Sequence, residues 1–331
     1  MRMFAALVAA FASLALGTGS ADAKKTLRLT VQLPLKSVLG QNLLQFKVDL
    51  EKATGGSLEV QIFDSAQLYD DRDVPAAVGA GQIDIGVASL ARYVGNIPAV
   101  DVFHVPFIFD SDAKLQAAVA PGSPVRGPID EAISMTGSRV LWWQAYGGTV
   151  LLTKGGQPVK TPSHIKGQKV RALSKLLGTW ISANGGVPVT VASGEQYFAY
   201  QRGAVDVGMT GLDSIRSRKL WEVMDTVTMA NMAAIEFVVV INEKIFQSLT
   251  EQERAAILAA STSAEIKLRE EITQIEKQAL DAARQNKMTV YAPNAAEMQA
   301  FRKSAEAVSV EFLRTAGPVG KIVYDAALAL K

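Results

Sequence analysis

The chain of 331 residues carries a formal net charge of +2 and has no cysteine, which excludes disulfides even in an oxidising compartment. A near-neutral charge argues against nucleic acid as the main partner. The hydrophobic fraction of 49% is enough to build packed cores in one large domain or two smaller ones.

The N-terminus has the pattern of a secretory signal peptide. Arg2 precedes an apolar run over residues 3–16, and small residues then lead to an A-x-A cleavage pattern at 21–23. The apolar run is too short for a stable membrane span, although an uncleaved anchor is the alternative. No later segment is long and apolar enough to cross a bilayer. We therefore expect residues 1–23 to be removed on export to the periplasm.

The first third of the chain alternates strands and helices. Strands are predicted over 26–33, 58–63 and 82–88. Helices are predicted over 38–53 and over a segment that begins at Asp70 or Asp71 and ends near Gly79. This alternation indicates an α/β fold with a largely parallel sheet. Ligands bind beyond the carboxyl ends of such strands, which places Gln32, Lys36 and Ser89 near a cleft.

The middle of the chain predicts a crossing into a second lobe. Helices are expected over 112–120 and 129–136, followed by a strand over 140–146. Alternation sends Trp142 and Trp143 to opposite faces of that strand. Two glycines at 147–148 break the strand, and residues 149–154 continue it.

A turn and a short strand at 158–173 carry the main functional signal. Thr161 caps a helical turn that Gly167 ends, and the strand over 168–173 places Lys169 and Arg171 on one face. An arginine at a strand end presents a rigid fork to a carboxylate. A surface salt bridge is the commoner role of an arginine in such a position.

The second lobe is predicted to repeat the topology of the first. After a helix over 176–184, a capping box at Ser193 opens another helix that ends at Gly203. A strand is predicted next over 204–209, and the segment GAVDVGM (203–209) echoes GQIDIGV (81–87). By analogy, Thr210 faces the cleft from the second lobe as Ser89 does from the first.

Three predicted elements complete the chain. A strand over 237–241 crosses back to the first lobe. A capping box at 250–253 opens a helix that runs to about residue 287, on the order of 50 Å long, and lies across both lobes. The alternative is two shorter helices broken near 261–263. A final helix is predicted over 295–315.

Catalytic motifs are scarce. The chain has two histidines; His104 is expected in the core and His164 in local hydrogen bonds. No phosphate loop and no G-x-S-x-G elbow occur, and a histidine-based metal site is not expected. The sequence does not exclude a catalytic pair of carboxylates, because Asp and Glu are plentiful. Neither a cofactor nor a metal is predicted.

The order of short motifs resembles that of the extracytoplasmic solute-binding proteins of TRAP transporters, the DctP-type family. The resemblance covers essentially the whole mature chain. The motifs on which this resemblance rests are EKATGG (51–56), AQLYDDR (66–72), VPFIF (105–109), IKGQKVR (165–171), GEQY (194–197) and LWEV (220–223).

The resemblance implies a fold and a function. The fold is α/β and two-lobed, with parallel-rich sheets, crossing strands as a hinge and a long helix spanning both lobes. The function is capture of a small organic acid between the lobes and its delivery to a membrane permease driven by an ion gradient. The carboxylate-binding arginine of the family falls on Arg171.

The chain departs from the sialic-acid-binding branch of that family. Val150 follows the Y-x-G-T segment where that branch has a second arginine, and Thr210 and Ser89 stand at its asparagine and its acidic residue. A smaller or more apolar acid is therefore expected: a 2-oxo or 2-hydroxy acid, a dicarboxylate or an aromatic acid. Lys36, Arg72 or Arg92 would supply a second cation for a dicarboxylate.

The sequence predicts two lobes, a monomer and a set of ligand-binding residues. Lobe I comprises residues 24–147 with about 236–270, and lobe II comprises 148–235 with about 271–331. A monomer is expected, since no self-pairing surface is evident. The alternatives to a transport role are a periplasmic carboxylate-dependent enzyme and a sensor-linked binding protein. The expected ligand-binding residues are Arg171, Gln32, Lys36, Arg72, Ser89, Tyr146, Lys169, Trp180, Tyr197, Thr210 and Asp213.

Overall fold

The computed structural model describes residues 24–331 of the chain. The predicted signal peptide, residues 1–23, lies outside the described residues. Among the helices in the described part of the chain, none combines the length and the apolar character that a membrane span needs.

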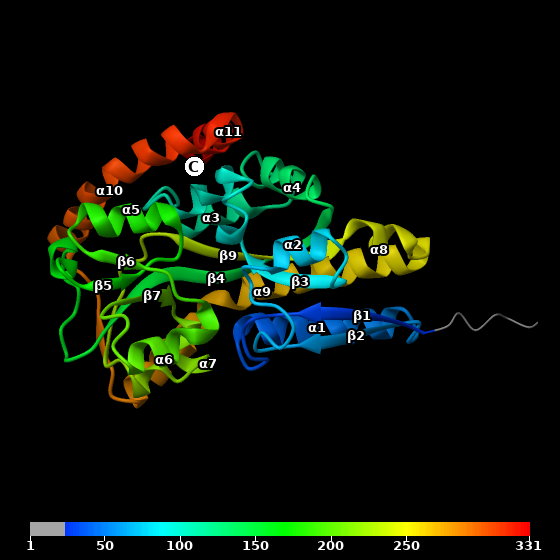
Figure 1. The fold of residues 1–331 in the computed structure, drawn as a ribbon, viewed down its shortest axis with the longest axis horizontal. Helices are drawn as coiled ribbons and strands as arrows, with labels where there is room; N and C mark the ends of the chain where they lie inside the picture. The colour runs from blue at the N-terminus through cyan, green and yellow to red at the C-terminus, as the bar shows by residue number, and fades with distance from the viewer. Residues whose placement is uncertain (1–23) are drawn as a thin grey trace, which may run out of the picture.

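The centre of the fold is an eight-stranded sheet in the order β10-β8-β4-β9-β3-β1-β2, with β7 paired to β4 (Figure 1). Its strands are β1 (Lys25–Thr30), β2 (Leu58–Phe63), β3 (Ile85–Ser89), β4 (Ser138–Thr153), β7 (Gly208–Gly211), β8 (Thr226–Thr228), β9 (Ala234–Asn242) and β10 (Thr289–Tyr291). The outer strands pair in parallel, as β1 does with β2 and β3. The antiparallel pairs all involve β4 or β9, the two strands that cross the molecule.

Helices surround this sheet, and a second sheet joins β5 (Lys169–Arg171) to β6 (Val187–Val189). The α-helices are α1 (Val38–Ala53), α2 (Val74–Gly79), α3 (Asp112–Val119), α4 (Arg126–Ser134), α5 (Lys175–Ala183), α6 (Gln196–Gln201), α7 (Asp213–Ser217), α8 (Glu243–Ser248), α9 (Glu251–Gln285), α10 (Ala295–Thr315) and α11 (Gly317–Ala329). Short 3-10 turns are η1 (Leu90–Arg92), η2 (Pro98–His104), η3 (Pro162–Ile165), η4 (Ser193–Glu195) and η5 (Leu220–Glu222).

Strand β4 changes partners along its length. Up to Gly148 it pairs with β9, and from Thr149 onward it pairs with β7 and β8. The register with β9 shifts between Ala145 and Gly148, where two glycines were predicted to break the strand. Gly147 has φ +85°, and a side chain there would collide with the Glu276 carboxylate of α9. The predicted break is therefore a bulge within one continuous strand.

Helix α9 is one unbroken element of 35 residues, so the alternative of two shorter helices is wrong. Its predicted capping box is present: Thr250 accepts from the backbone of Glu253, whose side chain accepts from the backbone of Thr250. Leu268 packs in a core with α1 and the first strands, whereas Ala279 packs with α6 and α7. In Figure 1 the helix passes behind the sheet from one end of the molecule toward the other.

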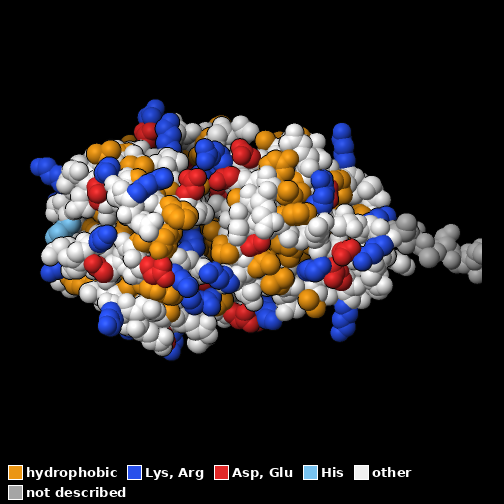
Figure 2. Space-filling model, turned by 60° about the horizontal axis from the view of Figure 1, so that its bottom comes forward, with side chains coloured by type: hydrophobic (Ala, Val, Ile, Leu, Met, Phe, Trp, Pro, Cys, Tyr) orange, Lys and Arg blue, Asp and Glu red, His pale blue; other side chains and the backbone are white. Residues whose placement is uncertain are grey.

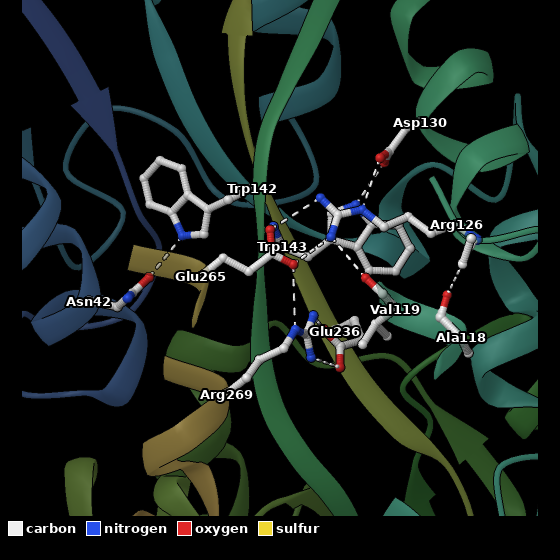
Figure 3. A network of polar contacts seen from close by, with 11 residues as sticks. Asn42, Ala118, Val119, Arg126, Asp130, Trp142, Trp143, Glu236, Glu265 and Arg269 are labelled. Carbon is white, nitrogen blue, oxygen red and sulfur yellow. Dashed lines mark hydrogen bonds and ion pairs between the residues drawn. The ribbon is translucent and has the colours of Figure 1, made fainter. Parts of the chain in front are cut away.

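The predicted opposite orientation of Trp142 and Trp143 is confirmed (Figure 3). The indole N–H of Trp142 donates to Asn42 of α1 at 2.9 Å, and that of Trp143 donates to Asp130 of α4 at 2.7 Å. Both rings are fully buried. The pair therefore fixes β4 between the helices on its two faces.

Two predicted helix caps are wrong. Asp73, and neither Asp70 nor Asp71, is the N-cap of α2, because Asp71 turns inward to pair with Arg92 at 3.0 Å. Ser193 caps no helix by its side chain, since its hydroxyl accepts from Arg171. In each case a tertiary partner competes successfully with the local cap.

Most other predicted elements are confirmed with small shifts at their ends. The helix over 38–53, the strand over 58–63 and the helix over 295–315 match residue for residue. The strand expected at 204–209 begins only at Gly208, and α11 was not predicted. The residue boundaries proposed for the two lobes stay a prediction.

Candidate functional site

Arg171 is the most deeply buried cation of the candidate site. It ends β5, and Val170 of this strand forms a bridge with Val207, the residue before β7. The Arg171 side chain is 1% exposed. Its Nε donates to the carbonyl of Val191 at 3.0 Å, its Nη1 to that of Met209 at 2.6 Å, and its Nη2 to the Ser193 hydroxyl at 3.2 Å.

These contacts leave the Arg171 charge without a counter-ion. All three acceptors are neutral, and the described residues place no carboxylate within ion-pair distance of this guanidinium. A guanidinium has five N–H donors, so two remain. Burial lowers the pKa of Arg171 to about 10. A buried, uncompensated charge costs several kcal/mol, and an anion in the cleft offsets that cost.

Arg218 is a second cation at this site, and no pattern in the sequence singled it out. It follows α7, and its Nη2 donates to the Tyr146 hydroxyl at 3.1 Å and to the Thr210 hydroxyl at 3.5 Å. Its Nη1 donates to the Ser193 carbonyl, while its Nε is buried without a partner. Tyr146 and Thr210, both predicted site residues, thus lie beside it.

Lobe I contributes polar atoms that lack partners. Gln32 is 2% exposed, and both its amide nitrogen and its amide oxygen are buried and unpaired. Its backbone lies beside Gly194, where an added Cβ would be 3.6 Å from the Gln32 carbonyl. Asp71 has one buried, unpaired oxygen, and burial raises its pKa. Ser89 is buried at the end of β3.

Asp213 connects the two sides of the cleft. One carboxylate oxygen accepts the backbone N–H of Val38, the first residue of α1, at 3.1 Å. The other accepts from Nη2 of Arg216 at 3.0 Å. The side chain is 2% exposed. Both oxygens therefore have protein partners, and the structure places Asp213 at the N-terminus of α1.

Five other predicted residues are not brought to Arg171. Lys36 and Arg72 are exposed. Lys169 shares a face of β5 with Arg171, but it lies at the outer end, where its Nζ donates to the Gly203 carbonyl at 2.8 Å. Trp180 is fully buried and stacks on Phe301, and the Tyr197 hydroxyl donates to Glu222.

The two histidines have the structural roles that were expected. His104 is buried, with Nδ1 2.9 Å from the Asp101 carboxylate. His164 hydrogen-bonds within the Thr161 turn. Within residues 24–331, no group of three or more His, Cys, Asp or Glu side chains is arranged to hold a metal ion.

A hollow of about 550 Å³ opens next to the site. Its lining includes Arg92 and Ala91 on one side and Ala172, Leu173 and Ser174, the residues that follow Arg171, on the other. On the face seen in Figure 2, basic and acidic side chains alternate with apolar ones, and no single basic patch dominates. Arg171 is buried, whereas Arg218 is only partly buried.

Comparisons with known proteins identify the family and the fold of this chain. The family model described as "Bacterial extracellular solute-binding protein, family 7" matches residues 30–315. The C4-dicarboxylate-binding periplasmic protein DctP of Rhodobacter capsulatus is 26% identical over 261 residues, which is 77% of this chain and 77% of that protein. The sialic acid-binding periplasmic protein SiaP of Vibrio cholerae is 27% identical over 245 residues, covering 73% and 74%.

Solved structures share the fold. A TRAP periplasmic solute-binding protein of Sulfurospirillum deleyianum with bound succinate has a TM-score of 0.87 at 23% identity, covering 93% of this chain and 100% of that chain. An extracytoplasmic solute receptor of Bordetella pertussis that binds pyroglutamic acid has a TM-score of 0.85 at 24% identity, covering 92% and 99%. With the family model spanning most of its length, this chain belongs to the family 7 bacterial extracellular solute-binding proteins, the group of TRAP transporter receptors that its motif order resembles.

Proposed function

We propose that this protein is a periplasmic receptor that captures a small organic acid between its lobes and delivers it to a TRAP-type membrane permease. Arg171 holds the acid's carboxylate. The protein acts as a monomer and leaves the ligand chemically unchanged. The solved relatives with bound succinate and bound pyroglutamic acid support a carboxylate as the ligand.

The observation that carries the proposal is the buried guanidinium of Arg171, which has no counter-ion among the described residues. Its two free N–H donors match a carboxylate, and each charge-assisted hydrogen bond contributes roughly 1.5–3 kcal/mol. Micromolar binding requires about 8 kcal/mol. Arg171 therefore supplies a large part of the affinity, and closure of the lobes around the ligand adds contacts that the open form lacks.

Calorimetric titration of the wild-type protein and its arginine variants tests this role. The acid is first identified by native mass spectrometry of the purified protein, followed by denaturation and analysis of what is released. Arg171→Ala should weaken binding of that acid by about 2–5 kcal/mol, because one partner of a buried charge pair is removed. Arg171→Lys should also weaken it, because the fork is lost.

The matched control is Arg314→Ala, which removes an exposed arginine on α10 that pairs with Glu311. This control should bind like the wild type. A released neutral molecule, or wild-type affinity in both Arg171 variants, would remove Arg171 from its proposed role.

A further inference from the structure

A second hollow, of about 390 Å³, is separate from the one beside Arg171, and the two share no lining residue. Its lining comes from the segment 107–115, the loop 229–234, helix α9 and the segment 292–302. By the proposed boundaries, the first of these segments belongs to lobe I and the other three belong to lobe II. The second hollow therefore lies where the two predicted lobes meet, outside the carboxylate site.

The glycine pair after Tyr146 makes room for two polar side chains of the second hollow. A Cβ at Gly147 would collide with the carboxylate of Glu276, and a Cβ at Gly148 would be 3.0 Å from the amide oxygen of Asn231. Both of these polar side chains line the second hollow. The bulge of β4 thus gives this hollow a carboxylate and an amide, a role that the carboxylate site does not explain.

Arg302 of α10 supplies a positive charge. Its guanidinium lies 4.7 Å from the ring centroid of Phe107, whose backbone has φ +63° and whose N–H donates to the Met232 carbonyl at 2.7 Å. Phenylalanine rarely adopts this conformation. Among the hydrogen bonds and ion pairs of residues 24–331, none involves the Arg302 side chain, so its N–H donors are available to a ligand.

Glu276 and Asp112 supply negative charge. One oxygen of Glu276 accepts the backbone N–H of Gly148 at 3.2 Å, and the other has no partner among the described residues. Burial, with Asp112 nearby, raises the pKa of Glu276. Within residues 24–331, neither carboxylate forms an ion pair, and they belong to no group arranged to hold a metal ion. The second hollow therefore carries opposite charges that do not neutralise each other.

We propose that the second hollow is a further binding site, which takes a small zwitterion whose ammonium and carboxylate groups are joined by an apolar chain. The ammonium pairs with Glu276 and Asp112, and the carboxylate pairs with Arg302. The amide of Asn231 is available to either group. A dicarboxylate does not fit, because its second charge would be repelled by Glu276 and Asp112. The apolar wall for the chain consists of Phe109, Leu115, Met229 and Met298.

The test asks whether binding needs both charges. The zwitterions β-alanine, γ-aminobutyrate and δ-aminovalerate are each compared with the alkylamine and the fatty acid of the same chain length, which lack one charge. Carbon-13-labelled methionine methyl groups report by NMR, because Met229 and Met298 line the second hollow; Met229→Leu and Met298→Leu assign their signals. The wild type and Arg171→Ala are both titrated, since only binding in the cleft depends on Arg171.

The best zwitterion should shift both methionine signals and bind about 10- to 150-fold more tightly than either single-charge probe, the ratio expected for one charge-assisted hydrogen bond. Arg302→Gln and Glu276→Gln should each lower its affinity by a similar factor. Arg314→Gln, which changes an exposed arginine on the same helix as Arg302, should bind like the wild type.

Three results would overturn the inference: a single-charge probe that binds as tightly as the zwitterion, no shift of the Met229 and Met298 signals with any zwitterion, or wild-type affinity in Arg302→Gln or Glu276→Gln. None of them bears on the binding of a carboxylate by Arg171, so the proposed function stands or falls separately.

Discussion

At the scale of single residues, the site is built from side chains whose charges and polar atoms are left unmatched. The two largest core side chains of β4 pair their polar atoms, since the indole N–H groups of Trp142 and Trp143 both donate to side-chain oxygens. Gln32, Arg171 and Arg218 are buried or partly buried, and each has at least one donor without a partner. Because unpaired buried groups are costly, their concentration at one place indicates a ligand.

Tyr146 is expected to act on the ligand through Arg218. Its hydroxyl accepts from Nη2 of Arg218, and burial raises its pKa to about 12, so it stays a neutral phenol at physiological pH. Tyr146→Phe should weaken binding of the ligand by about 1–2 kcal/mol, because the guanidinium loses one of its positioning acceptors. The loss should be constant between about pH 6 and 8, since a phenol with so high a pKa does not titrate there.

Calorimetry at several pH values checks this prediction, with Tyr197→Phe as the control, since the Tyr197 hydroxyl bonds Glu222 on the surface. Unchanged affinity in Tyr146→Phe would show that Thr210 and Ser193 position Arg218 without it. A pH-dependent loss would mean that another group titrates in the site.

Part of the site was predictable from the sequence, for an identifiable reason. Arg171 follows a turn with strong local signals, Ser89 ends β3 and Gln32 comes two residues after β1, so topology alone predicts them near the cleft. The positions of Arg218 and Trp180 could not be predicted from local sequence patterns. Arg218 is placed by the turn after α7, and Trp180 is drawn into the core by Phe301 of α10, contacts between segments that no local pattern links.

At the scale of elements, a buried ion network fixes α9 to the crossing strands (Figure 3). Arg126 of α4 pairs with Glu265 of α9, and Arg269 of α9 pairs with Glu236 of β9 at 3.0 Å. Each member of the network is at most 12% exposed. The network therefore joins a helix of the first half of the chain, the long helix and a hinge strand.

Glu265→Leu should destabilise the protein by about 3–5 kcal/mol, because it leaves Arg126 as a buried charge without its main partner. The double variant Arg126→Met/Glu265→Leu should recover a substantial part of this loss, since no isolated charge remains at that position. Urea unfolding followed by circular dichroism measures both. If the double variant were less stable than Glu265→Leu, the loss of Arg126 would have removed more stabilising contacts with its other neighbours, such as Asp130, than the isolated charge had cost.

The contribution of the Glu276 side chain to the stability of the protein is expected to depend on pH. It lies at the β4 bulge, where it accepts the backbone N–H of Gly148 at 3.2 Å, and burial, with Asp112 nearby, raises its pKa. A raised folded-state pKa means that the carboxyl contributes most to stability when protonated, below its unfolded pKa. That contribution is lost as the pH rises through the folded pKa.

Glu276→Gln keeps an acceptor for Gly148 and removes the charge. We expect its melting temperature to exceed that of the wild type near pH 7 and to approach it near pH 4, about the unfolded pKa of a glutamate. Thermal unfolding across this range, with exposed Glu306→Gln as the control, measures the difference. A variant less stable than the wild type at neutral pH would mean that the ionised carboxylate stabilises the bulge.

Elements were predictable where local signals and tertiary contacts agree. The capping box at Thr250 and the apolar periodicity of α1 are kept in the fold. The caps at Asp71 and Ser193 were wrong because Arg92 and Arg171, both distant in sequence, take the same oxygens. The missed helix α11 starts directly after α10 with a proline in its first turn, and it packs against η2, a long-range contact that no local pattern indicates.

At the scale of the whole molecule, two strands and one long helix run between the two predicted lobes, and we expect the ligand site to lie between these lobes. The chain passes between the halves through β4, β9 and α9. A ligand that contacts both halves stabilises the arrangement in which they approach. The bond between Asp213 and Val38 joins α7 to α1 and needs the same approach, although it involves no ligand.

Asp213 is therefore expected to act on affinity through closure. Its carboxylate lies at the N-terminus of α1, a 16-residue helix, where a negative charge is stabilised by about 0.3–2 kcal/mol. Asp213→Asn keeps one acceptor for the Val38 N–H but loses that charge and the pair with Arg216. Ligand affinity should fall by about 2- to 30-fold, the same free energy expressed as a ratio.

Interlobe distances separate closure from a direct effect on the ligand. Because the chain has no cysteine, Gln61→Cys and Arg202→Cys give two unique labelling sites at exposed positions, one in each predicted lobe. Pulsed electron spin resonance should show that Asp213→Asn shifts the distance distribution toward larger separations, whereas Arg218→Gln at saturating ligand should not. Weaker binding with an unchanged distance distribution would mean that Asp213 contacts the ligand directly, as the sequence predicted.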